Sequence, residues 1–110
     1  MDQGEYKANR KKEMKKYIIT YHFHDNSRNY FPFYEAIKEN LPENRHVLED
    51  VWIVNSDKTA KEIVQILIPY LHFENYDCDT LFVAEIDKTN VEGMIAKSLW
   101  PFITDEEKEK

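Results

Sequence analysis

The sequence predicts one α+β domain with the element order β-α-β-β-α-β and a short C-terminal helical extension. The chain has 110 residues, close to the size of a common single domain. Its hydrophobic fraction of 42% and aromatic fraction of 14% suit a packed core. Along the chain, the spacing of apolar residues changes between the two-residue repeat of strands and the 3.6-residue repeat of helices.

The first strand and the first helix are expected at residues 17–24 and 31–41. The stretch YIITYHFH is rich in β-branched and aromatic residues, which favour strands. Because side chains alternate between the two faces of a strand, one face carries Ile18, Thr20, His22 and His24 and becomes more polar toward the end of the strand. In the helix, Pro32 suits the first turn. The residues expected on its buried face are Phe33, Ala36, Ile37 and Leu41.

The middle of the chain, RHVLEDVWIVNS, is interpreted as one long bent strand or as two short strands joined around Glu49 and Asp50. A second helix follows, because Thr59 and Glu62 have the spacing of a capping box. Pro69 is expected to end or kink that helix. Its predicted buried stripe consists of Ile63, Ile66, Leu67, Tyr70 and Leu71.

The segment HFENYDCD is expected to be a loop before a last strand at residues 80–86. One or two short helical turns should then pack on the sheet through Met94, Ile95, Leu99, Trp100 and Phe102. Two adjacent middle strands argue against a parallel flavodoxin-like sheet and favour a ferredoxin-like fold. In that fold, helices cover one face of an antiparallel sheet.

Charge divides the chain into a basic leader (1–16), a folded domain (17–103) and a charged, frayed tail (104–110). The net charge of −6 comprises +3, −7 and −2 in these three segments. An acidic body is a poor general binder of nucleic acid. The chain contains no apolar run that is long enough to span a membrane. It has one cysteine, so an internal disulfide is excluded. We expect a cytoplasmic protein.

The best candidate for chemistry is the cluster of His22, His24 and Asp25. In a strand, the two histidines project from one face with Cα atoms about 7 Å apart. With Asp25, they could hold a borderline divalent metal, or they could transfer protons on a phosphodiester. The alternative, which we favour, is that they bind backbone groups or water where the strand leaves the core. No cofactor is therefore expected, with a divalent metal as the alternative.

The candidates for binding nucleic acid are weaker: they are Arg28, Tyr30 and Arg45. Guanidinium groups can contact phosphate, and an aromatic ring can stack on a base. All three also suit ordinary loop positions. The chain has only two glycines, so a glycine-rich phosphate loop is excluded.

Three segments resemble a known family: YIITYHF, LEDVWIVNSDKTAKEIVQIL, and DTLFVAEID with the nearby LWPFI. They are similar to the small ferredoxin-like relatives of the CRISPR-associated integration-complex nuclease subunit, and especially to the stand-alone SinR-like branch. The resemblance implies a homodimer formed through strand edges. Nuclease members carry an Asp at the end of the first strand, where this chain has His22. Imidazole serves Mg²⁺ poorly, so the departure argues against a Mg²⁺ nuclease.

The interpretation we favour is a non-catalytic dimeric protein-interaction or regulatory module, linked to mobile elements or defence. The first alternative is a nuclease that uses His22, His24 and Asp25 with Mn²⁺, Zn²⁺ or Ni²⁺. The second alternative is nucleic-acid binding without cleavage, through the basic leader, Arg28 and Arg45.

Overall fold

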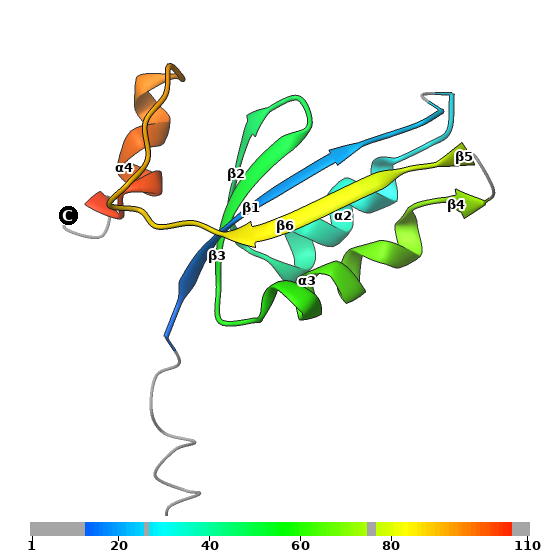
Figure 1. Ribbon diagram of the computed structural model, residues 1–110, viewed down its shortest axis with the longest axis horizontal. Coiled ribbons are helices and arrows are strands. Elements are labelled where there is room, and N and C mark those ends of the chain that lie inside the picture. The colour runs from blue at the N-terminus through cyan, green and yellow to red at the C-terminus, as the bar shows by residue number, and fades with distance from the viewer. Residues whose placement is uncertain (1–12, 26, 75–76, 107–110) are drawn as a thin grey trace, which may run out of the picture.

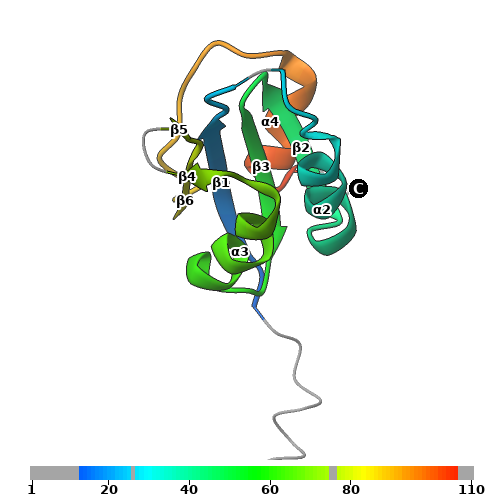
Figure 2. The same cartoon turned by 90° about the vertical axis from the view of Figure 1, so that its right-hand side faces the viewer.

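The computed structural model describes residues 13–25, 27–74 and 77–106. A four-stranded antiparallel sheet has the order β2-β3-β1-β6. Its strands are β1 (Lys15–His22), β2 (Glu43–Leu48), β3 (Val51–Ser56) and β6 (Thr80–Glu85). Helices α2 (Phe31–Asn40) and α3 (Ala60–Leu67) connect the strands and pack against one face of the sheet (Figures 1 and 2). The arrangement is compatible with a ferredoxin-like fold.

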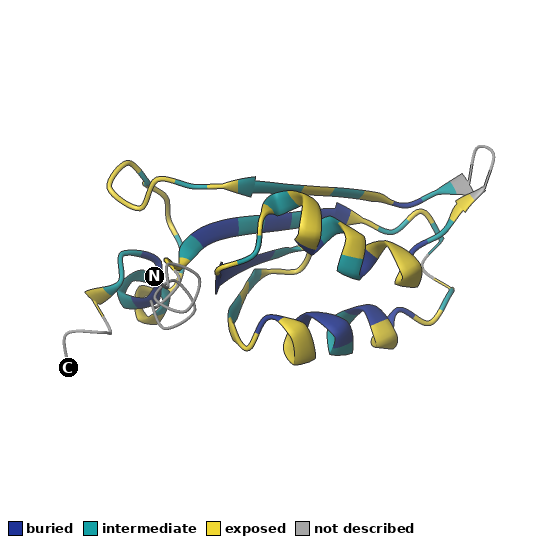
Figure 3. Ribbon diagram, turned by 90° about the horizontal axis from the view of Figure 1, so that it is seen from below, coloured by how far each residue is buried: buried dark blue, intermediate teal, exposed yellow. Residues whose placement is uncertain are grey.

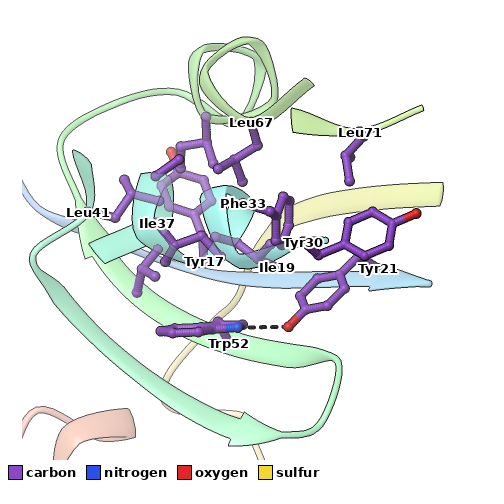
Figure 4. Packing of buried hydrophobic residues seen from close by; sticks show 13 residues of the cluster. Tyr17, Ile19, Tyr21, Tyr30, Phe33, Ile37, Leu41, Trp52, Leu67 and Leu71 are labelled. Atoms are coloured by element: carbon purple, nitrogen blue, oxygen red, sulfur yellow. Dashed lines mark hydrogen bonds between the residues drawn. The ribbon is translucent and has the colours of Figure 1, made fainter. Parts of the chain in front are cut away.

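The main core lies between this face and the two helices (Figure 3). Tyr17, Ile19 and Tyr21 of β1 alternate into it, and Trp52 and Val54 of β3 lie in the neighbouring rows. Trp52 donates a hydrogen bond from Nε1 to the Tyr21 hydroxyl at 2.9 Å (Figure 4). The expected face of α2 is confirmed, since Phe33, Ala36, Ile37 and Leu41 are all buried.

The signals predicted for α3 are also confirmed. Thr59 and Glu62 form both hydrogen bonds of the capping box. The helix ends at Leu67, and Pro69 lies in the 3₁₀ turn η1 (Ile68–Tyr70) that follows. One member of the predicted stripe is wrong: Tyr70 is 40% exposed, because the chain has left the helical repeat before reaching it.

The C-terminal extension packs on the opposite face of the sheet, which we call the outer face. It contains a 3₁₀ turn, η2 (Lys97–Leu99), and the short helix α4 (Trp100–Ile103). Phe102 and Ile103 are buried against Ile53 of β3, with Ile95, Leu99 and Trp100 beside them. Met94, which was expected in this contact, is fully exposed because it lies in the non-helical segment before η2.

Besides one-residue differences at the ends of α2 and β6, the structure departs from the expected organisation in three places. β1 begins at Lys15, inside the expected leader, and ends at His22, two residues before the expected strand end. Asp105, assigned to the frayed tail, contacts the buried Lys16. The segment expected to be a loop contains a hairpin of β4 (Phe73–Glu74) and β5 (Asp77–Cys78). The two middle strands form a tight hairpin at Glu49 and Asp50, as one alternative foresaw.

Candidate functional site

The outer edge of β6, Leu81–Glu85, is the first feature of the site. β6 pairs with β1 in six consecutive positions without a register shift. The amide of Ile86 donates to the carbonyl of Lys16, so even-numbered residues of β6 direct their backbone groups toward β1. Strand alternation then directs the N–H and C=O groups of Leu81, Val83 and Glu85 away from the sheet. Among the described residues, no strand pairs with that side.

The outer face beside this edge is only half covered. The row formed by Thr20, Val51 and Phe82 lies beyond the C-terminal extension, and Phe82 is 64% exposed. A cavity of about 320 Å³ opens here. Its lining includes Thr20, His22, Thr80 and Phe82. The open strand edge beside it is a place where another chain can pair.

His22 lies at the end of β1, exposed, and opposite Thr80 of β6. It lines the 320 Å³ cavity and a neighbouring cavity of about 200 Å³. Asp50, from the β2–β3 turn, lines both of them as well. No local sequence pattern points to Asp50, because only the pairing of β1 with β3 brings it beside the end of β1.

His24 and Asp25 do not continue the strand geometry that would align them with His22, because β1 has already ended. The backbone N–H of His24 donates to a carboxylate oxygen of Asp79 at 2.8 Å. Asp25 accepts from both the hydroxyl and the backbone N–H of Ser27. Those hydrogen bonds lower the pKa of Asp25 below its usual range. The cluster thus acts locally as a turn that ends β1.

Asp79 lies in the segment that was expected to be a loop, and its burial was not predicted from the sequence. It is 2% exposed, and it accepts hydrogen bonds from the backbone N–H groups of His24 and His72 and from the Tyr30 hydroxyl. Burial alone would raise the pKa of Asp79, but these hydrogen bonds lower it on balance. The carboxylate ties the end of β1, the start of α2 and the β4–β5 hairpin together. Tyr30 is 49 residues and His24 is 55 residues from Asp79 along the chain, so no local sequence motif predicts this cluster.

Of the three residues proposed for nucleic acid, Arg28 and Tyr30 both contact His72, whereas Arg45 lies apart from them on β2. Tyr30 is 6% exposed and stacks on Phe23 at a ring-centroid distance of 3.6 Å, so its ring lies in the core of this structure and not at the surface. Burial and the bond to Asp79 raise its pKa to about 12. Arg28, in the loop after β1, contacts Nδ1 of His72 at 3.0 Å. Arg45, on β2, lies over the ring of Phe102.

Comparison with known proteins adds no assignment. No family model, no curated protein and no solved structure matches the chain. Within residues 13–25, 27–74 and 77–106, no three His, Cys, Asp or Glu side chains gather in a way that could hold a metal ion. No helix in that part of the chain has the length and apolar character to cross a bilayer.

Proposed function

We propose that the chain is a non-catalytic protein-interaction or regulatory module of ferredoxin-like fold, and that two copies join through β6. The observation that carries the proposal is the outer edge of β6, which is regular, apolar and open. A flat apolar edge of this kind is a ready template for another strand.

Antiparallel pairing about a two-fold axis at Val83 fits this edge. It would place Val83 of one copy opposite Val83 of the other, and Leu81 opposite Glu85. The outward N–H and C=O groups of all three residues would then be paired, and the two sheets would become continuous. Phe82 of each copy would lie close to the junction on the outer face. Burial of its exposed ring would add apolar area to the backbone hydrogen bonds.

The molar mass in solution tests the proposal. Light scattering over a dilution series from about 100 to 1 μM should give twice the 13.3 kDa mass of the chain at the concentrated end. A Val83→Pro variant removes one outward N–H and should shift the equilibrium toward the monomer, since proline is tolerated on an edge but cannot donate. A monomer at every concentration would contradict the proposal.

A metal-dependent nuclease is the second candidate, and the cavities shared by His22 and Asp50 favour it. Imidazole nitrogen suits Zn²⁺ and carboxylate oxygen suits Mn²⁺, so the two side chains together offer a ligand to either ion. The test is cleavage of single-stranded RNA and duplex DNA with each metal. Activity that both His22→Ala and Asp50→Asn abolish would support this candidate, whereas the first proposal expects no cleavage.

A further inference from the structure

The C-terminal extension covers part of the outer face with a small core of its own. We call residues 87–106 the strap. Among the residues that the structure describes, three buried ones form the centre of this second core: Ile53 of β3, and Phe102 and Ile103 of the strap. None of them belongs to the main core, which lies on the other side of the sheet. The strap therefore depends on the sheet, whereas the main core does not depend on the strap.

Charged groups hold the strap in place. The Lys16 ammonium is almost completely buried and forms an ion pair with Asp105 at 3.0 Å. It also donates to the Phe102 carbonyl at 2.9 Å and lies over the Phe102 ring. On the other side of Asp105, the Lys88 ammonium is 2.7 Å from the carboxylate. Arg45 contributes a second cation over the Phe102 ring, 4.4 Å from its centroid.

This arrangement makes the closed strap sensitive to one residue. Desolvation of two charges can cancel most of the attraction in a buried ion pair, while removal of the Asp105 charge would leave the buried Lys16 ammonium without that carboxylate, although the Asn55 amide oxygen and the Phe102 carbonyl would still accept from it. Opening would return Lys16 to water and so recover its desolvation cost. Asp105 also has a φ of 69°, a left-handed conformation that the closed state must maintain.

We propose that the strap opens from the outer face as one unit while the main core stays folded, and that Asp105 is the latch that keeps it closed. Partial opening of this kind is common where few apolar contacts hold a segment. Opening would expose Ile53 and extend the apolar outer face from Phe82 across the sheet. The inference does not rest on β6 pairing, because the strap contacts the outer face rather than the outer edge of β6.

Amide hydrogen exchange on the full chain tests the inference. The reporters are Leu99, Thr104 and Asp105, whose amides donate within the strap. In the unaltered protein they should exchange at least about tenfold faster than the most protected amides of α2 and α3. Asp105→Asn should accelerate the strap amides by a further factor of about ten and leave the core amides unchanged.

Glu106→Gln is the matched control, because it removes the same charge from the adjacent, exposed residue. It should leave strap exchange unchanged. Equal exchange of strap and core in the unaltered protein would overturn the idea of a separate unit. If Asp105→Asn and Glu106→Gln behaved alike, Asp105 would not be the latch. Should the Asp105 variant fail to fold, exchange in the unaltered protein under low urea still decides whether the strap opens first.

Discussion

The two edge strands of the sheet differ in how they meet solvent. β2 has a register shift between His46 and Leu48, follows Pro42, and carries Arg45. β6 pairs regularly with β1 over its whole length and contains no Lys, Arg or Pro in TLFVAE. Bulges, cationic side chains and prolines are the devices by which edges avoid pairing with other chains. β2 has the register shift and a cation, although the guanidinium of Arg45 lies over Phe102 and Pro42 comes just before the strand; β6 has none of the three.

The difference supports the proposed pairing of two copies through β6. An unprotected edge exposes a protein to aggregation unless a defined partner covers it. Two exposed residues near the edges allow a matched test. Leu48 of β2 and Phe82 of β6 lie at opposite ends of one row across the sheet, with Val51 and Thr20 between them. Both are apolar and both are more than half exposed.

The largest expected effect is the loss of association in Phe82→Lys. In the proposed register, residue 82 lies next to the two-fold axis and diagonally across from its copy, so two added cations would repel each other and should weaken dimerisation at least about a hundredfold, or roughly 2.7 kcal/mol. Leu48→Lys introduces the same charge at the protected edge and should change association less than about twofold. Sedimentation equilibrium measures both constants. Equal effects of the two substitutions would show that exposure of apolar surface, rather than the β6 edge, controls association.

The sequence predicts the elements of the fold, but it does not predict the contacts between distant segments or which strands are edges. The capping box at Thr59 and the breaker at Pro69 act within a few residues, so both were found. The buried role of Asp79 depends on donors that reach it only after the sheet has formed. The approach of Asp50 to His22 has the same origin. Strand order also decides which strands are edges, and no local pattern in TLFVAE reports it.

Asp79→Asn tests whether the end of the β6 edge is held by the buried carboxylate. The substituted amide keeps one acceptor oxygen but turns an NH₂ group toward backbone donors. We expect a loss of about 2 kcal/mol in the free energy of unfolding, measured in urea, because hydrogen bonds to a charged group are stronger than neutral ones. A loss below about 0.5 kcal/mol would mean that the carboxylate does not hold these three segments together.

The same carboxylate should make stability fall in acid. Because the folded state lowers the pKa of Asp79, ionisation stabilises the protein above the unfolded pKa of about 3.9. That contribution is lost as the pH falls from there through the lower folded pKa. The free energy of unfolding, measured in urea, should therefore decline less steeply between about pH 5 and 2 in Asp79→Asn than in the unaltered protein. Parallel curves would contradict the assignment.

The smallest expected effect separates stability from association. Thr59→Ala removes the N-cap of α3, which lies on the helical side of the sheet, and should cost about 1 kcal/mol in the free energy of unfolding. The dimerisation constant should stay within about twofold of its original value, since the outer edge of β6 is untouched. A marked loss of dimer in this variant would link association to global stability instead of to the edge.

The most direct test of β6 pairing is amide exchange by NMR at high and low protein concentration. If two copies pair through β6, the amides of Leu81, Val83 and Glu85 should be protected in the concentrated sample and should lose that protection on dilution. The amides of Phe82 and Ala84, which face β1, should remain protected throughout. Fast exchange of Leu81, Val83 and Glu85 at every concentration would show that this edge stays open to water and would contradict the account.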